Sequence, residues 1–394
     1  MKKISIIGAG ASGLICAIFC ASSSLKVDLY EQNSKAGKKI LVSGNGRCNI
    51  SNKNLSPNNY FSDNPNFVEY ALNEFGFSRF EKFCNSIGLI LDLKDDGKAY
   101  PLSYEAKSVV TLLQAEAKRL GVNFIYDTKV TDIDKLYKDS DAVVVATGSE
   151  AASHLGGNSD GLDFAKHYGH NIIQTYPSLV QFEINSSIFK RMAGAKVNGE
   201  VTLLVNNQVE GSASGDILFT PYGLSGFSIL DISQSASISL REYQNVQVSL
   251  NLLPTYNAQK LSTYISNTSK NIPNLNILEI LSALLPSKIV IGILEHLDIS
   301  NDTRDIQTKL SKKIANSIIN WRFNVEDTHG FRHAEVAGGG VDTQEVDPKT
   351  MQSLKQKNLY FCGEVLDVVG ARGGYNFAFA WASGFVAAQN ISKV

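Results

Sequence analysis

The hydrophobic pattern at the start of the chain predicts a strand, a helix and a second strand. An apolar run over residues 4–7 meets a glycine-rich turn, Gly8 to Gly13, and an apolar helical run follows over residues 14–21. A second apolar run, residues 27–30, ends at Glu31. This order is typical of a dinucleotide-binding βαβ unit, in which a strand, a glycine turn, a helix and a second strand are followed by an acidic residue. We therefore predict a nucleotide site here and not a merely structural turn.

Each glycine of this turn has a mechanical role in such a site. Gly8 permits the tight turn, Gly10 lets the backbone approach a pyrophosphate, and Gly13 lets the helix pack closely on the strand. The phosphates would then lie on unpaired N–H groups at the helix N-terminus. Glu31 is placed to accept hydrogen bonds from a ribose diol.

The next part of the chain alternates between helical and strand patterns. It predicts helices over residues 66–87 and 103–120, the second with Ser103 as its N-cap, and strands over residues 122–126 and 129–133. Residues 141–146 then form an apolar strand that ends in Thr147-Gly148, as expected of a buried parallel strand whose carboxyl end meets a ligand. A further helix is predicted over residues 162–168.

The pattern changes in the middle third of the chain. Residues 179–253 alternate like antiparallel strands, with turn signals at Asn198-Gly199, Asn206-Asn207, Gly211 and Gly215-Asp216. From residue 256 to about 323 the pattern is helical. Residues 277–294 are apolar, but they are interrupted by Glu279, Pro286 and Lys288. This interruption predicts a packed helical pair and no membrane span.

The doubly wound pattern resumes near the end, with a strand over residues 359–362, a glycine turn over 370–376 and a helix over 377–388. We therefore predict an α/β fold with a Rossmann-like nucleotide-binding domain that is discontinuous in sequence, residues 1–170 and 330–394. The insertion is predicted to form an antiparallel β subdomain, barrel-like or sandwich-like, over residues 171–255 and a helical subdomain over residues 256–329.

Composition and charge narrow the classes of function. Of 394 residues, 37 are Lys or Arg and 38 are Asp or Glu, so no global basic excess favours nucleic acid as a partner, although a local patch is compatible with this balance. The five cysteines form no CxxC pair, which indicates neither a disulfide framework nor a metal site. The amino-terminal apolar run is broken by glycines, so we expect no secretory leader and a cytoplasmic protein without membrane attachment.

A second glycine-rich segment, Ser43 to Asn52, follows the nucleotide acid directly. Glycines alternate there with small polar side chains and Arg47. Taken alone, such a segment is more often a polar surface loop. Its position after Glu31 favours a loop that wraps an anionic ligand through backbone N–H groups.

Four motifs identify a family resemblance: Ser43-Gly44-Asn45-Gly46-Arg47-Cys48-Asn49, Gly338-Gly339-Gly340-Val341, Gly363-Glu364-Val365-Leu366-Asp367 and Gly373-Gly374-Tyr375-Asn376. Together with the fingerprint they resemble the YhiN/BaiN-like (aminoacetone-oxidase-like) NAD(P)/FAD-dependent oxidoreductases, within the glutathione-reductase-like FAD-binding superfamily. The motifs span almost the whole chain in the family's order. The chain departs from the family pattern at three positions. Pro221 and Phe227 stand where many relatives have His and Pro, and Ala337 stands where many have Thr. Because of these differences, the substrate of a relative cannot safely be assigned to this chain.

The resemblance implies FAD as the cofactor. Its binding residues would be Gly8, Gly10, Ala11, Ser12, Gly13, Glu31, Lys39, Ser43, Gly44, Gly46, Arg47, Cys48, Asn49, Val130, Thr147, Gly148, Gly363, Glu364, Gly374, Tyr375, Asn376 and Phe377. No second fingerprint appears in the insertion, so NAD(P)H is a candidate transient co-substrate without a domain of its own.

The implied activity is hydride transfer between flavin and an unidentified small organic substrate. Two alternatives stay open: an FAD-dependent nucleic-acid-modifying enzyme, and a flavin-binding regulatory protein without turnover. Nucleic acid is not expected as a partner, and the oligomeric state is open. Catalytic candidates are Cys48, Arg372, Tyr375 and His333, with Arg47, Tyr222, His329 and Arg332 as further substrate-side groups. A surface arginine or a structural histidine is the plain alternative for each, and Cys48 lacks the paired cysteine that a thiol relay needs.

Overall fold

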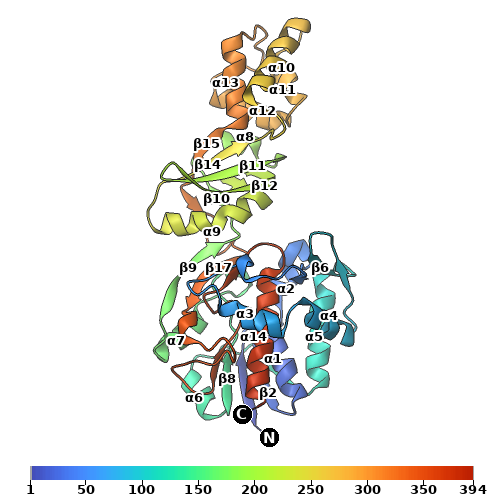
Figure 1. Cartoon of the computed structure of the whole chain (residues 1–394), viewed down its shortest axis with the longest axis vertical. Coiled ribbons are helices and arrows are strands. Elements are labelled where there is room, and N and C mark those ends of the chain that lie inside the picture. Colours follow the sequence, from blue (N-terminus) through green and yellow to red (C-terminus); the bar gives the residue numbers. More distant parts are fainter. Residues whose placement is uncertain (1, 394) are drawn as a thin grey trace. The chain divides into compact units, whose positions relative to one another are not determined.

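The computed structural model describes residues 2–393 and divides into two compact units (Figure 1). The first unit joins the chain up to Tyr176 with the chain from Glu335 onward, and the second unit is Pro177–Ala334. The sequence pattern predicted the boundaries between the nucleotide-binding domain and the insertion at residues 170 and 330. The further division of the insertion into two subdomains stays a prediction.

The first unit is built on a parallel sheet of five strands in the order β18-β8-β1-β2-β7. The strands are β1 (Lys3–Ile7), β2 (Lys26–Tyr30), β7 (Asn123–Ile125), β8 (Ala142–Val145) and β18 (Leu359–Phe361). Every residue of β8 is buried, as its unbroken apolar run predicts. The predicted doubly wound α/β fold is confirmed, and β18, from the C-terminal part of the chain, lies beside β8, the strand that precedes Thr147.

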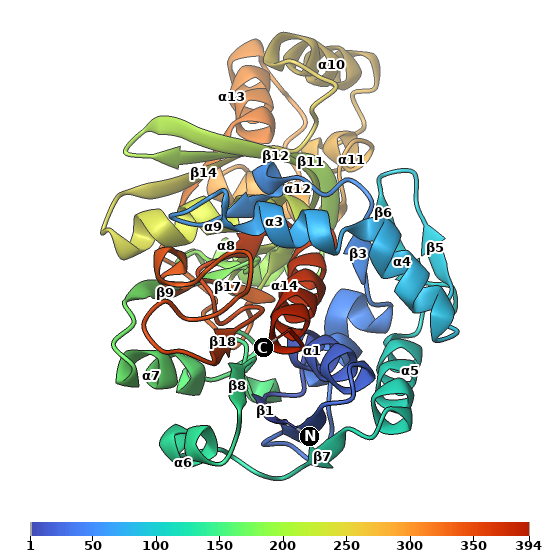
Figure 2. The same cartoon turned by 60° about the horizontal axis from the view of Figure 1, so that its bottom comes forward.

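The first and last helices of the chain pack against each other in this unit (Figure 2). They are α1 (Ala11–Ser22) and α14 (Tyr375–Ile391), and both are buried over most of their length. Small residues permit the close approach: a Cβ on Gly384 would lie 2.4 Å from the carbonyl oxygen of Ser12. Because each helix follows a glycine turn, the packing brings two helix N-termini from opposite ends of the chain into one unit.

Three predictions in this unit are wrong in detail. The helix expected over residues 66–87 is two helices, α3 (Phe67–Glu74) and α4 (Phe77–Ser86), separated at Gly76, where a Cβ would lie 2.7 Å from the Leu72 carbonyl oxygen. Ser103 is not an N-cap, because α5 (Ala106–Arg119) begins after Glu105, and the Ser103 hydroxyl accepts from the Glu105 N–H instead.

The third error is the strand expected over residues 129–133. Asp132 caps α6 (Ile133–Lys138) there by accepting a hydrogen bond from the Lys135 N–H at 2.9 Å. The remaining elements of the unit are α2 (Lys38–Val42), β3 (Ser51–Asn52), β4 (Tyr60–Phe61), β5 (Leu91–Leu93), β6 (Lys98–Pro101), α7 (Asp160–His167), β9 (Ile172–Ser178), which runs on into the second unit, β17 (Val336–Val341) and β19 (Val369–Gly370), with short 3₁₀ turns between some of them.

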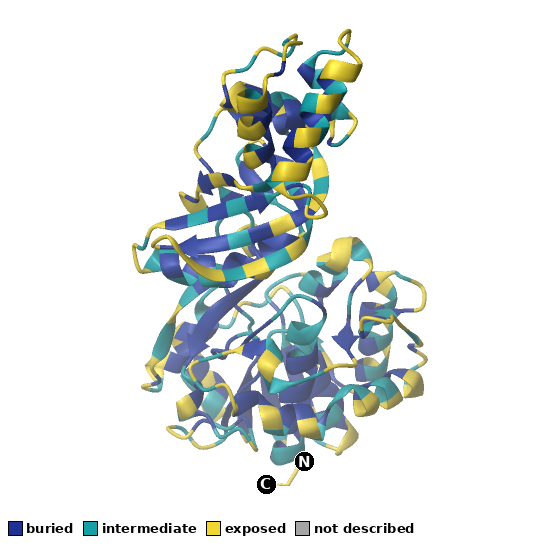
Figure 3. Ribbon diagram, turned by 45° about the horizontal axis from the view of Figure 1, so that its top comes forward, coloured by how far each residue is buried: buried dark blue, intermediate teal, exposed yellow. Residues whose placement is uncertain are grey.

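The second unit is built on an antiparallel sheet in the order β15-β14-β11-β12-β13-β10-β16. Its strands are β10 (Phe182–Glu183), β11 (Lys196–Val205), β12 (Gln208–Thr220), β13 (Gly223–Ser225), β14 (Val246–Asn251), β15 (Trp321–Asn324) and β16 (Asp327–Thr328). Buried residues alternate with more exposed ones through the middle of β11, as expected of a sheet with one covered face, and its last three residues are all buried (Figure 3).

One of the predicted turns in this sheet is confirmed. Asn206 and Asn207 have φ angles of 51° and 67° and join β11 to β12 as a two-residue hairpin. The other turn predictions are wrong, because Asn198-Gly199 lies inside β11 and both Gly211 and Gly215-Asp216 lie inside β12. Gly199 serves close approach between strands, since its Cβ would lie 2.6 Å from the Asn251 carbonyl oxygen.

The helices of the second unit are α8 (Ile188–Met192), α9 (Phe227–Arg241), α10 (Ala258–Asn271), α11 (Ile277–Ser282), α12 (Ser287–His296) and α13 (Thr308–Ile319). The packed pair α11 and α12 confirms the interpretation of residues 277–294. Two expectations fail: α9 interrupts the predicted strands, and β15 ends the predicted helical stretch by returning to the sheet. One apolar cluster runs through both sheet and helices, so they share a single core. No helix among residues 2–393 is long and apolar enough to cross a membrane.

Candidate functional site

The glycine turn after β1 leaves open space at one position and none at two others. A Cβ on Gly8 would lie 2.4 Å from the Ala146 carbonyl oxygen, and one on Gly13 would lie 1.9 Å from the Gly8 carbonyl oxygen. A Cβ on Gly10 would meet no heavy atom within 4 Å. Gly8 and Gly13 therefore serve packing within the protein, whereas the space beside Gly10 is free for a ligand to approach the backbone.

Glu31 lies at the end of β2 against this turn and is only 8% exposed. Its Oε2 accepts a hydrogen bond from the Ala9 N–H at 3.0 Å, and its Oε1 accepts from the Asn33 N–H at 2.9 Å and from Asn33 Nδ2 at 2.7 Å. An ionised carboxylate has about four acceptor positions, so one acceptor position stays open for a hydroxyl donor. Val130 lies partly buried in the segment that follows, whose Thr128 N–H donates to the Glu31 carbonyl oxygen.

Two buried polar atoms near these turns have no hydrogen-bond partner among the described residues. They are Oγ1 of Thr147, directly after β8, and Oδ1 of Asn49, in the loop beside Gly374. Buried polar atoms in proteins are normally paired, so an orphaned one points to a missing partner. Gly148, next to Thr147, also has open space where a Cβ would point. These atoms suit a polar ligand that lies along the carboxyl end of the parallel sheet.

The Glu364 carboxylate joins three distant segments of the first unit. Its Oε2 accepts from Lys39 Nζ at 2.8 Å, and its Oε1 accepts from Ser149 Oγ at 2.7 Å and from the Ala337 N–H at 2.9 Å. Sequence reasoning named Lys39 and Glu364 but not Ser149. The position of Ser149 directly after Thr147-Gly148 was the signal that would have identified it.

The glycine turn before α14 is held by amide side chains. Asn376 Oδ1 accepts from the Gly370 N–H at 2.7 Å and its Nδ2 donates to the Gly370 carbonyl oxygen at 2.8 Å. Asn52 Nδ2 donates to the Gly373 carbonyl oxygen at 2.9 Å. A Cβ on Gly374, whose φ is 95°, would lie 2.4 Å from the Ser51 carbonyl oxygen. The side chain of Asn376 thus shapes the turn, and backbone N–H groups are what the turn presents.

Both helices that follow the glycine turns lack a side-chain cap. Neither α1 nor α14 has a capping side chain or an acidic residue in its first turn. The first N–H groups of a helix have no partner within the helix and carry the positive end of its dipole. The unit thus contains two such helix N-termini, an acidic residue at the end of β2 and unpaired buried polar atoms. Together these groups fit a ligand that has phosphates, a ribose and a polar ring, such as a flavin dinucleotide.

Cys48 lies in the glycine-rich loop but is not an activated thiol. It is fully buried with a φ of 56°, and burial raises the pKa of its thiol to about 11, while a hydrogen bond with Ser43 opposes that rise. Elsewhere in this loop, the Ser43 hydroxyl donates a hydrogen bond to the Ile40 carbonyl oxygen. The Arg47 side chain, which precedes Cys48, is exposed to solvent. The thiolate is the nucleophilic form of cysteine, so this environment argues against thiol chemistry.

A second cluster of candidate residues lies in the second unit. The rings of Tyr222 and His329 stack at 3.9 Å between centroids and 5° between planes, and the His329 and His333 centroids lie 4.1 Å apart. His329 Nδ1 lies 2.7 Å from Glu183 Oε1. Sheet register explains the gathering, since β10 lies between β13 and β16 and brings Glu183 beside segments from both sides. Sequence reasoning missed Glu183, because its partner lies 146 residues away.

The predicted catalytic candidates divide between the two units. Cys48, Arg372 and Tyr375 belong to the first unit, and Tyr222, His329, Arg332 and His333 belong to the second. Burial, more than any neighbouring charge, raises the pKa of the half-buried Tyr375 hydroxyl. Phe377 stacks on Trp381 at 5.6 Å, so its side chain supports α14.

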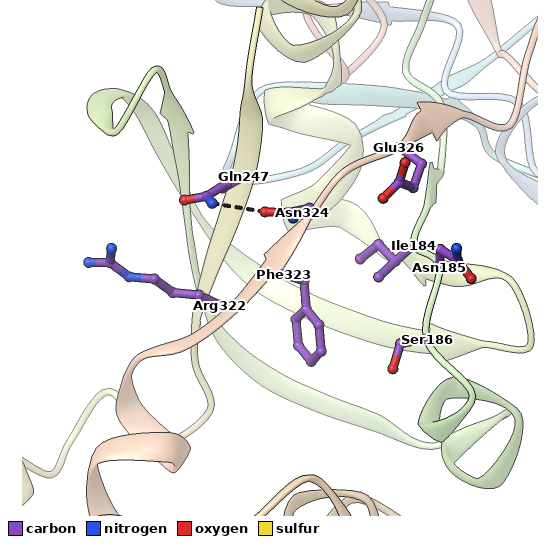
Figure 4. A pocket seen from close by; sticks show the side chains of 8 residues that line it. All are labelled: Ile184, Asn185, Ser186, Gln247, Arg322, Phe323, Asn324 and Glu326. Atoms are coloured by element: carbon purple, nitrogen blue, oxygen red, sulfur yellow. Dashed lines mark hydrogen bonds between the residues drawn. The ribbon is translucent and has the colours of Figure 1, made fainter.

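The second unit also contains a shallow pocket of about 280 Å³ (Figure 4). Its walls are Ile184, Asn185, Ser186, Gln247, Arg322, Phe323, Asn324 and Glu326. Gln247 Nε2 donates to Asn324 Oδ1 at 2.8 Å, and Figure 4 shows Arg322 directed away from Ile184 and Phe323. The volume of this pocket is at the small end of the range for ligand sites. Within the described chain, no ion pair joins its two charged residues, Arg322 and Glu326.

Asp367, in the Gly363 to Asp367 motif, offers a test of this geometry through pH. It is 4% exposed, and burial raises the pKa of its carboxyl, while the Asp63 N–H and the Ser62 hydroxyl donate to it. A carboxyl whose pKa is raised on folding stabilises the fold fully below the unfolded pKa of about 3.9 and loses that contribution as pH rises through its folded pKa. We therefore expect Asp367→Asn, which keeps an acceptor without the charge, to raise the melting temperature at pH 7 and to lose that advantage near pH 3.5.

Thermal unfolding followed by circular dichroism at both pH values checks this expectation. Asp367→Leu is the control, because it leaves the Asp63 N–H without its acceptor and should melt earlier at both pH values. An Asp367→Asn protein that is less stable than the parent at pH 7 would contradict the assignment.

Comparisons with known proteins agree with this geometry. A family model described as the HI0933-like protein Rossmann domain matches residues 2–390. The 3-dehydro-bile acid delta(4,6)-reductase of Clostridium scindens is 32% identical over 408 residues and covers 100% of both chains. The ribosomal RNA dihydrouridine synthase of Haemophilus influenzae is 31% identical over 407 residues, covering 98% of each chain.

A solved structure shares the fold at much lower identity. The 3-ketosteroid delta1-dehydrogenase of Sterolibacterium denitrificans, in complex with 1,4-androstadiene-3,17-dione, is 10% identical, covers 100% of both chains and has a TM-score of 0.50. At this identity the likeness extends to the fold alone.

Proposed function

This chain belongs to the HI0933-like family and is a flavin-dependent oxidoreductase, and from that premise we propose that it reduces a carbon–carbon double bond conjugated with a carbonyl group. The single observation that carries the proposal is the chemistry that the two relatives' names share. A 3-dehydro-bile acid with double bonds at positions 4 and 6 is a conjugated ketone, and uridine becomes dihydrouridine by saturation of a bond conjugated with a ring carbonyl.

The residues of the first unit fit FAD, and we propose which of them hold it. The backbone around Gly10 and the N-terminus of α1 would take the pyrophosphate, and Glu31 a ribose. Thr147, Asn49 and the N-terminus of α14 would take polar atoms of the remainder. Bound FAD, once reduced, supplies a hydride to an electron-poor carbon. The Lys39–Glu364–Ser149 network would fix three of the segments that line the cofactor.

Hydride addition to a conjugated double bond needs a proton at the neighbouring carbon, and we propose His329 as its source. With Nδ1–H donated to Glu183, Nε2 is the ring atom of His329 that is left to hold a proton and give it. Stacking against Tyr222 and His333 holds the ring in one orientation. Orientation of this kind is what general acid catalysis requires before any question of acidity.

The electron donor is the next part of the proposal. We propose NAD(P)H as a transient donor that reduces FAD and leaves, because the fold contains one glycine fingerprint, after β1. The proposed setting is the cytoplasm, where nicotinamide donors are kept reduced. A second candidate function is reduction of a uracil base in RNA, which the name of the Haemophilus influenzae relative favours.

Anaerobic spectroscopy tests the proposal. We expect the purified protein to show flavin absorbance that NADH or NADPH bleaches, and expect a 3-oxo-Δ4 steroid or a simple cyclic enone to restore it. Uridine-containing RNA is the parallel acceptor, and saturated ketones are the control. Flavin that is reduced but reoxidised equally by saturated and unsaturated ketones, or by neither unsaturated ketones nor RNA, would contradict the choice of substrate class.

A further inference from the structure

Two helices of the second unit carry positive charge without any acidic residue. Helix α10 contains Lys260 and Lys270, and helix α13 contains Lys309, Lys312 and Lys313, with no Asp or Glu in either helix. The chain as a whole has a formal net charge of −1. These two helices therefore carry a local net positive charge that the overall balance of the chain conceals.

The two helices pack through the faces opposite the lysines. Ser311 Oγ lies 2.9 Å from Ser262 Oγ and 2.8 Å from Ser266 Oγ, and Ile265 and Ile314 are fully buried in the same core cluster. All five lysines are exposed (Figure 3 shows the exposed faces of these helices). The contact between α10 and α13 thus leaves the lysine-bearing faces to solvent.

These lysines are also free of carboxylate partners within the described chain. Ion pairs of the second unit lie on other elements, where they join Arg191 to Glu295, Lys196 to Asp216 and His329 to Glu183 among others. Among residues 2–393, the ammonium group of Lys313 donates a hydrogen bond to the Leu297 carbonyl oxygen at 3.0 Å, and those of the other four lysines have no such partner. The five acidic residues between α10 and α13 in sequence lie on α11, on α12 and in the loop before α13.

The neutral side chains on the same faces have a matching chemistry. Thr263, Asn267 and Asn316 are exposed among the lysines, and Tyr256 is 37% exposed just before α10. Lysines, hydroxyls and amides contact phosphate and sugar oxygens in nucleic-acid complexes, and exposed aromatic rings stack on unpaired bases. A nucleic-acid strand offers phosphates to the lysines, sugar and phosphate oxygens to the hydroxyls and amides, and base faces to the tyrosine ring.

We propose that the lysine faces of α10 and α13 bind an RNA strand through its phosphates. The contact is independent of sequence, because lysines, hydroxyls and amides contact the backbone, and a stacked ring contacts the face of a base and not its edge. It goes beyond the proposed reductase activity and does not depend on it. If RNA is also the substrate, these faces hold the strand, and if a small molecule is the substrate, they tether the enzyme to RNA.

Fluorescence anisotropy with a labelled single-stranded RNA of about 20 nucleotides tests this surface. With three to five lysine contacts, the logarithm of the affinity should fall with the logarithm of salt concentration with a slope of about −2 to −3.5. Replacing three lysines together, Lys260→Gln, Lys309→Gln and Lys312→Gln, should weaken binding by more than about tenfold and reduce the slope by about two.

The matched control carries the same change of charge on the first unit: Lys107→Gln, Lys118→Gln and Lys138→Gln, all exposed helical residues. We expect it to bind RNA within about twofold of the parent, and circular dichroism should show both variants folded. Equal binding by the two triple variants, or no salt-sensitive RNA binding by the parent protein, would overturn the proposal. Both outcomes are measured without reductase activity, so neither of them would contradict the proposed function.

Discussion

Replacing Gly10 by alanine should weaken FAD binding strongly and leave the fold intact, whereas replacing Gly13 should disrupt both. Gly10 has a φ of −80°, which alanine adopts readily, and a Cβ there meets no atom of the protein. If the pyrophosphate occupies that space, the methyl group displaces it, and we expect FAD affinity to fall by about a hundredfold or more, equivalent to roughly 3 kcal/mol. A Cβ on Gly13 would instead lie 1.9 Å from a backbone oxygen that cannot move aside.

Flavin fluorescence titration and thermal unfolding of the flavin-free proteins separate the two effects. The flavin-free Gly10→Ala protein should melt within a few degrees of the parent, while Gly13→Ala should melt far earlier or fail to fold, because overpacking against backbone costs about 3 kcal/mol or more. Gly211→Ala is a matched control, since its Cβ also meets nothing within 4 Å but lies in the second unit. Unchanged FAD affinity in Gly10→Ala would refute the assigned phosphate position.

Local signals explain why the nucleotide-binding half of the fold was predictable. The strand, turn and helix around Gly8 to Gly13 are adjacent in sequence, and each carries its own pattern. The errors arose where a distant segment decides the structure. Gly199 resembles a turn residue, but the backbone of β14 requires a glycine there. Trp321–Asn324 follows a helix and became strand β15 because β14 offers it an open edge.

The same distinction applies to the site. Glu31 and Lys39 were found because they belong to motifs, and Tyr222 and His329 were found only by residue type. The partners that give these residues a role, Ser149 and Glu183, have no motif of their own. Pairing in the sheet and packing between segments more than a hundred residues apart bring them into place, and a sequence pattern does not encode such distances.

His329 is the residue whose replacement should most reduce turnover without loss of flavin. If it donates the proton, His329→Gln should slow reoxidation of reduced flavin by a conjugated ketone by about 10²- to 10⁴-fold, the usual contribution of a general acid. Reduction of the flavin by NAD(P)H or dithionite needs no such acid and should stay near the parent rate. Stopped-flow absorbance measures the two half-reactions separately.

Replacing Glu183 and His329 separately and together gives a sharper test of the proton donor than replacing His329 alone. Glu183→Gln keeps an acceptor for Nδ1–H, but a neutral amide holds the ring by a weaker hydrogen bond than a carboxylate does, so its effect on reoxidation should be smaller, about tenfold to a hundredfold. Since both variants disable one proton donor, the double variant should be no slower than His329→Gln. His296→Gln, an exposed histidine on α12 in the same unit, should behave like the parent. Equal slowing of both half-reactions, or independent effects of the two replacements, would mean that the pair shapes the fold and does not transfer the proton.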